Sequence, residues 1–170
     1  MTYFPYWYRL SRTDAYLIWY TDDASAGAKA DGVLLDDAGC LLTFPALSDL
    51  QNHAERRGLV VDLQTNGEPL DLDHVQRWLG AARKTTVDCQ VFLEAWNLFS
   101  DIASAVQGKQ AHIDDQKESR IYEKLFWGNN LPALTPPGKH YAPVWTKSEV
   151  GRLRSVLNRG MQLFQGRQNP

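Results

Sequence analysis

The chain has 170 residues, of which 44% are hydrophobic and 22% charged, a composition that fits one globular domain and excludes intrinsic disorder. Its net charge is −2, and it carries neither a basic leader before an apolar stretch nor 18 consecutive apolar residues. We therefore expect no membrane association and a cytoplasmic location. Cys40 and Cys89 lie far apart and form no C-x-x-C pair, so we expect two free thiols.

The first part of the chain carries strand patterns, rich in aromatic residues and β-formers. They cover residues 6–10, 15–20, 32–35 and 40–44, and we expect an antiparallel meander. The run Asp36-Asp37-Ala38-Gly39 between the last two predicts a hairpin turn with a positive φ at Gly39.

The chain then predicts a short helix and one more strand. Ser48 to Gln51 matches a capping box, and the helix that it opens should end at Gly58. The apolar run 59–63 predicts a strand, followed by a turn at Asn66-Gly67.

From about residue 71 the hydrophobic spacing becomes helical. Asp71 or Asp73 is expected to cap a helix that ends near Arg83-Lys84. A second helix is predicted over 87–106 and should end at Gly108. A third is predicted over 117–127, beginning after Asp115 and ending at Gly128. The last begins at 147, after the capping box Thr146–Glu149. Strands followed by helices indicate a single α+β domain, strand-rich over about 1–66 and helix-rich over about 71–166.

The connector between the last two predicted helices is unusually long. Its sequence, GNNLPALTPPGKHYAPVWT from Gly128 to Thr146, contains four prolines, whereas helix–helix connections usually need about 2 to 8 residues. We expect it to wrap the domain and to pack His140, Tyr141 and Trp145 onto the core. The alternative is that it forms a contact surface, since loops on a rigid scaffold commonly bind partners.

Signatures of catalysis are absent. There is no G-x-G-x-x-G, no P-loop and no G-x-S-x-G, and the four histidines are isolated, so we expect no enzyme activity, no metal and no cofactor. Asp71, Asp73 and His74 could act as an acid/base or metal group, but at a helix start the same residues are expected as caps. The arginines Arg152, Arg154 and Arg159 alternate with apolar positions, which indicates a solvated helix face and not a nucleic-acid site.

The charge is divided along the chain. Residues 14–73 contain twelve acidic and three basic side chains. The acidic residues concentrate in predicted turns and strand ends: Asp22, Asp23, Asp31, Asp36, Asp37, Glu68, Asp71 and Asp73. This is either a solubilising surface or a negative face that binds a basic partner, for which a nucleic-acid-cleaving protein is a natural choice.

The segment Leu125 to Phe164 resembles the C-terminal part of immunity proteins from bacterial contact-dependent growth inhibition systems, the CdiI group. The similar features are NNLPALTP, the GKHY-x-P-x-W segment and the capped final helix. The resemblance implies a cytosolic protein that binds one basic toxin domain of a cognate CdiA effector, often a nuclease, and neutralises it. The alternatives are a small enzyme that uses Asp71, Asp73 and His74, or a subunit of a constitutive complex.

Overall fold

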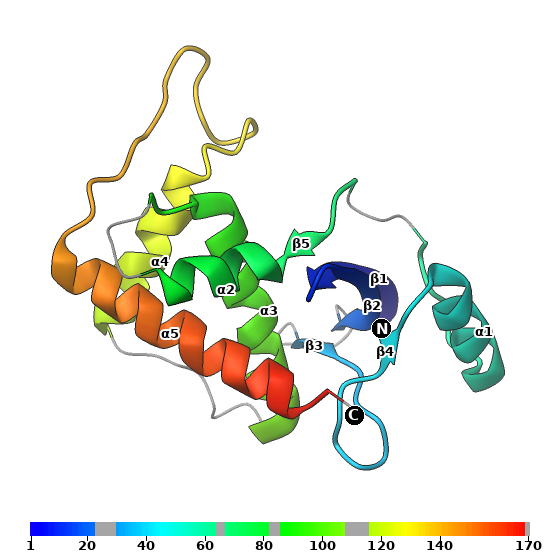
Figure 1. Ribbon diagram of the computed structural model, residues 1–170. Coiled ribbons are helices and arrows are strands. Elements are labelled where there is room, and N and C mark those ends of the chain that lie inside the picture. The colour runs from blue at the N-terminus through cyan, green and yellow to red at the C-terminus, as the bar shows by residue number, and fades with distance from the viewer. Residues whose placement is uncertain (23–29, 64–66, 82–85, 108–115, 169–170) are drawn as a thin grey trace.

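The computed structural model describes residues 1–22, 30–63, 67–81, 86–107 and 116–168. The strands are β1 (Thr2–Leu10), β2 (Thr13–Asp22), β3 (Ala30–Val33), β4 (Thr43–Phe44) and β5 (Leu70–Asp71). The helices are α1 (Leu47–Arg57), α2 (Leu72–Gly80), α3 (Cys89–Gln107), α4 (Gln116–Gly128) and α5 (Lys147–Gly166). The order confirms the predicted α+β class, with strands mainly in the N-terminal half (Figure 1).

The sheet is mixed and not the simple antiparallel meander predicted. Its strand order is β3-β2-β1-β5, and β4 also pairs with β2. The pairs β1–β2 and β2–β3 are antiparallel as expected, but β5 joins β1 in parallel at Tyr8↔Leu70 and Arg9↔Asp71. This late strand was missed because two residues carry no periodic pattern.

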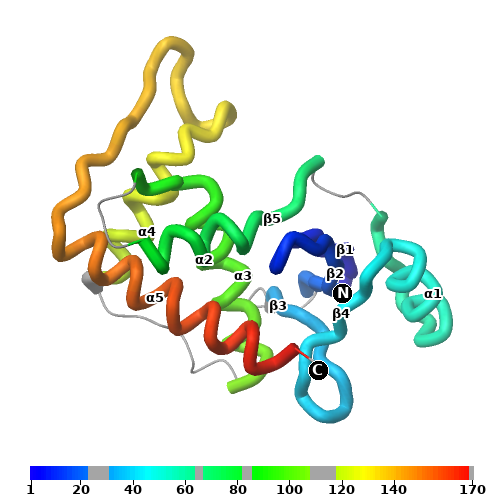
Figure 2. Tube along the Cα trace, in the orientation of Figure 1, coloured from blue at the N-terminus to red at the C-terminus, as the bar shows by residue number. Residues whose placement is uncertain are grey.

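The β1–β2 hairpin has two buried faces, which explains its dense aromatic sequence. One face, with Tyr8, Leu10 and Leu17, belongs to the main core formed with α2, α3, α4 and α5. The opposite face packs Ile18 against Phe44 and Leu50 of α1. In Figures 1 and 2, α1 accordingly lies on the side of the sheet away from the other helices. Strands buried on both faces lose the alternation of polar and apolar residues.

Two local predictions in this region are wrong. Helix α1 starts at Leu47 with Ala46 as its N-cap, so Ser48 lies inside the first turn and no side chain caps the helix. Segment 59–63 forms no strand, because its pairing is limited to one bridge between Val61 and Tyr3 and a hydrogen bond from Asp62 N to Tyr3 O. The left-handed C-cap at Gly58, with φ of 66°, is confirmed.

The turn at residues 36–39 is confirmed. Gly39 has φ of 77°, its N–H donates to the Asp36 carbonyl at 3.0 Å, and Asp36 N donates to Cys40 O at 2.8 Å. Leu35 and Leu41 form a bridge beyond it. Beyond this bridge the returning chain pairs with β2 as β4.

The helical predictions hold, and α3 is the central helix. Asp71 caps α2 by accepting from His74 N at 2.8 Å, and Thr146 with Glu149 forms the predicted capping box of α5. Helix α2 ends at Gly80, before the predicted end near Arg83-Lys84. The residues Asn66, Arg83-Lys84, Gly108 and Asp115 themselves lie outside the described residues. Helix α3 buries eight residues and packs directly on α5, where Gly160 faces the ring of Phe99. None of the described helices is both long and apolar enough to cross a bilayer.

Candidate functional site: the projecting connector and its basal cavity

The structure spreads the acidic residues predicted to bind a partner over three places. Asp22 and Asp31 lie at one end of the β2–β3 ladder, whereas Asp71 and Asp73 lie beside the β1–β2 turn at the other end. Eight residues of roughly 3.3 Å rise put these ends roughly 26 Å apart along β2. Asp36 and Asp37 form a third position, near Arg167, and Asp23 lies outside the described residues. They do not form one continuous patch.

Two of these carboxylates, Asp36 and Asp73, hold turns in place. Asp36 accepts from the N–H groups of Ala38 and Cys40. Asp73 accepts from Ser11 N at 2.7 Å and Arg12 N at 2.8 Å, and so anchors a turn in which both residues have positive φ. Asp31, Asp37 and Glu68 are exposed.

The group Asp71, Asp73 and His74 does not converge on a common point. Asp71 caps α2 and pairs with Arg77 at 3.3 Å, while Asp73 accepts hydrogen bonds from the β1–β2 turn. His74 stacks on Phe92 with ring centroids 5.7 Å apart, and its Nε2 lies 3.5 Å from the Asp88 carboxylate. These contacts agree with the capping interpretation.

A second polar group, missed from the sequence, lies between α3 and the sheet. Asp101 accepts from the indole Nε1 of Trp19 at 2.8 Å. Burial raises the pKa of Asp101 to about 6. The hydrogen bond from Trp19 offsets part of this rise, and the charge of Asp31 adds a smaller one. Burial, followed by the charges of Glu94 and Asp101, also raises the pKa of the Tyr6 hydroxyl. The carboxylates are hidden in the apolar stripe of α3, so no sequence pattern marks them.

The connector between α4 and α5 does not wrap the domain as predicted. Figure 1 shows it as a long loop that projects beyond the helices. His140 and Tyr141 are exposed, and of the three residues expected to pack inward only Trp145 packs against the core. The prediction failed because proline stiffness and aromatic content fit a projecting loop as well as a wrapping one.

The base of the connector is closed by one side chain. Asn130, with φ of 50°, donates from Nδ2 to the carbonyls of Gly128 and Tyr141, both at 2.9 Å. Its Oδ1 accepts from Tyr141 N at 2.7 Å. These bonds join the two legs of the loop, so residues 131–140 form a closed excursion.

The returning leg is held against α4 and α5. Lys124 donates to Val144 O at 2.9 Å, pairs with Glu149 at 2.5 Å and lies over the Trp145 ring. Gly128 permits this packing, since a Cβ there would lie 2.5 Å from Cys89 Sγ and 2.9 Å from Pro143 Cγ. The loop is therefore anchored at both legs while its outer part is exposed.

The exposed part carries many apolar side chains. Among the described residues, eight large hydrophobic side chains are exposed, and five of them lie between 127 and 144. We define the connector surface as Trp127, Leu131, Leu134, Tyr141 and Val144, with Val144 83% exposed. Five exposed apolar side chains within one segment, residues 127–144, make this segment the candidate interaction site.

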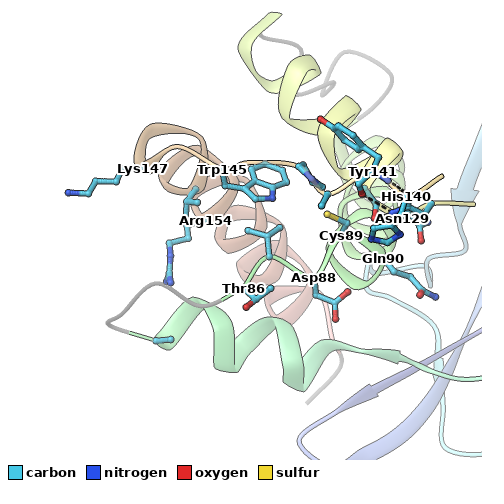
Figure 3. Close-up of a pocket in the computed structure, with 17 residues that line it drawn as sticks. Thr86, Asp88, Cys89, Gln90, Asn129, His140, Tyr141, Trp145, Lys147 and Arg154 are labelled. Atoms are coloured by element: carbon cyan, nitrogen blue, oxygen red, sulfur yellow. Dashed lines mark hydrogen bonds between the residues drawn. The ribbon is translucent and has the colours of Figure 1, made fainter. Parts of the chain in front are cut away.

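A cavity of about 910 Å³, here called the basal cavity, lies at the foot of the connector. Its walls are the returning leg, residues 86–90 before and at the start of α3, and the first turns of α5. Figure 3 shows Cys89, Asn129 and His140 on one side of it and Lys147 with Arg154 on the other. Burial, and then the charge of Asp88, raises the pKa of the Cys89 thiol, which disfavours the nucleophilic thiolate. Both cysteines are free, as expected.

Across the described ranges, no three His, Cys, Asp or Glu side chains come together in a way that could hold a metal ion. Comparisons of the chain with protein-family models, with curated proteins and with solved structures found no match. The candidate site therefore consists of an anchored, projecting loop with exposed apolar side chains and a cavity beneath it.

Proposed function

We propose that this chain is a cytoplasmic immunity protein that binds the toxin domain of a cognate CdiA-type effector and neutralises it in a one-to-one complex. The observation that carries the proposal is the connector surface. It combines exposed apolar side chains with a backbone anchored by Asn130 and Lys124. The same segment carries the sequence resemblance to immunity proteins.

The connector surface has the properties of a tight-binding interface. Aromatic and large apolar side chains supply most of the binding energy in protein complexes. A loop that is already ordered before binding loses less conformational entropy when it docks. The four prolines and the Asn130 bonds fix the loop in advance, so Trp127, Leu134 and Tyr141 can act as anchors.

The acidic residues have a separate role in this proposal. Because they lie in three separate places and do not form one patch, they attract a basic toxin domain at long range instead of forming the contact itself. The exposed Asp37 tests this role, since Asp37→Lys should slow association with little effect on dissociation. An unchanged association rate at low salt would remove the acidic residues from the mechanism.

The connector surface is tested with a matched pair of valines. Val144 and Val60 are 83% and 84% exposed, and only Val144 lies in the connector. Calorimetric titration with the C-terminal domain encoded by the upstream neighbouring gene should give one-to-one binding. Val144→Asp should weaken it by about tenfold or more, because a charge would be buried in an apolar contact, whereas Val60→Asp should not. The reverse result would place the interface elsewhere.

An exposed apolar surface also suits a subunit of a constitutive complex. The isolated protein discriminates the two cases, because a subunit that lacks its permanent partner tends to self-associate through the uncovered surface. An immunity protein should remain monomeric in sedimentation as its concentration is raised. Failure of the toxin domain to bind, together with self-association abolished by Val144→Asp, would favour the constitutive subunit.

A further inference from the structure

Arg154 lies half-buried on the wall of the basal cavity without a carboxylate partner among the described residues. Its guanidinium lies over the Trp78 ring at 4.5 Å, and Nη1 donates to Leu79 O at 2.9 Å. A guanidinium carries five N–H donors in a planar fork that fits a carboxylate. Most of these donors remain for a ligand.

A second cation lines the same side of the cavity. Lys147 is the first residue of α5 and is exposed, and no described carboxylate pairs with it. Lys124 differs, because Glu149 neutralises it beside Trp145. Figure 3 shows the Lys147 side chain directed away from the cavity, so Lys147 adds positive charge near this end, while Arg154 is the cation on the wall itself.

The acidic group of the cavity is already engaged. Asp88 accepts from Val91 N at 3.2 Å through Oδ1, and its Oδ2 lies 3.5 Å from His74 Nε2. Figure 3 shows Asp88 apart from Arg154, with Thr86 between them in this view. Asp88 thus leaves the cationic end available to an anion.

Apolar side chains form the rest of the wall near the cations. Val87, Trp145 and Val150 line the cavity and pack against the main core. A ligand that fits both features carries an anionic group next to an apolar one. Sites with apolar walls and a few placed polar groups are typical of specific recognition.

We infer that the basal cavity binds a carboxylate side chain presented, next to an apolar residue, on a peptide segment of the bound partner. The carboxylate pairs with Arg154, the exposed Lys147 adds electrostatic attraction from the rim, and the apolar neighbour packs on Trp145. Tyr141 belongs both to the cavity wall and to the connector surface, so one partner can cover both. The assignment of the peptide to the toxin partner rests on the proposed function.

The cavity is tested with a defined probe on the full chain. Two-dimensional NMR of ¹⁵N-labelled protein would follow titration with acetyl-Phe-Asp-Phe-amide and with acetyl-Phe-Asn-Phe-amide. The acidic peptide should shift the Trp145 indole and the amides of Val87 to Gln90, and should bind about tenfold more tightly than the amide peptide, since charge-assisted bonds are lost. Equal binding of both peptides, or shifts away from the cavity, would overturn the inference.

Variants of the cavity residues test where the peptide carboxylate binds. Arg154→Gln and Lys147→Gln should each weaken the acidic peptide severalfold. Lys139→Gln is the matched control, because Lys139 is exposed on the connector but does not line the cavity. Lys147 is exposed, so its variant remains informative if Arg154→Gln loosens the packing on Trp78. Succinate distinguishes the source: equal binding of succinate would show a site for small free carboxylates and refute a peptide site.

The same variants separate this inference from the proposed function. If the toxin domain binds and neither Arg154→Gln nor Lys147→Gln changes its affinity, the cavity does not receive the toxin, although the immunity function stands. If the toxin domain does not bind while the acidic peptide does, the proposed function fails and the carboxylate site remains.

Discussion

Replacement of Gly160 by alanine should destabilise the domain, although alanine is the better helix former. Gly160 is buried in α5, and a Cβ there would lie 2.6 Å from Phe99 Cβ, with the ring atoms Cγ and Cδ2 closer still. Real carbon contacts are about 3.5 to 4.0 Å, so α3 and α5 would have to separate by roughly an ångström. Overpacking of this kind costs about 1 to 3 kcal/mol and sometimes more, against a helix-propensity gain of about 1 kcal/mol.

Gly151 of the same helix is the matched control. It is exposed, and a Cβ there would meet nothing within 4 Å. Gly151→Ala should therefore raise the free energy of unfolding by about 0.5 to 1 kcal/mol, while Gly160→Ala should lower it by about 1 to 2 kcal/mol. For a domain of this size the two melting temperatures should differ by about 3 to 12 °C in calorimetry. Equal stabilisation by both changes would refute the close approach of α5 to Phe99.

Three further predictions concern the groups that position the sheet and the connector. Asp101→Asn should stabilise the protein above about pH 7 and change its stability little below about pH 4. The pKa of Asp101 in the folded protein is about 6, above its unfolded value, so the native protein loses stability as this carboxyl ionises between about pH 4 and 6. Melting temperatures of both proteins measured across this pH range test the prediction. Asn130→Gly keeps the positive φ but removes three hydrogen bonds, so amide exchange at Tyr141 should speed up about tenfold, and unchanged protection would show that the loop is held otherwise. Asp73→Ala leaves the N–H groups of Ser11 and Arg12 without their acceptor and should cost about 1 to 2 kcal/mol in urea unfolding, whereas Asp37→Ala should stay within about 0.5 kcal/mol.

The helical half was predictable because its signals are local. The stripe of α3, the Asp71 cap and the Thr146–Glu149 capping box all follow from spacing within one or two turns. The failures in the strand half have a common cause. Whether segment 59–63 becomes a strand depends on the edge of β1, and whether β5 forms depends on Tyr8 and Arg9, about sixty residues away.

The candidate site divides in the same way. The sequence singled out the connector by its length and prolines. It could not decide whether the connector packs inward or projects, because a segment rich in proline and aromatic residues suits either arrangement. The Asn130 bonds to Tyr141, and the Lys124 contacts from α4, decided it. Likewise the basal cavity unites residues 86–90, the returning leg and α5, which no local spacing brings together.

By itself the sequence determined the α+β class, the helices, the N-caps of α2 and α5 and the turn at 36–39, since these depend on short-range hydrogen bonds and periodic burial. Only the tertiary structure decided which strands pair, which carboxylates serve as structural acceptors and which way the connector points. Those outcomes depend on contacts between distant segments, and such contacts form only where the whole chain satisfies its buried polar groups and packs its core.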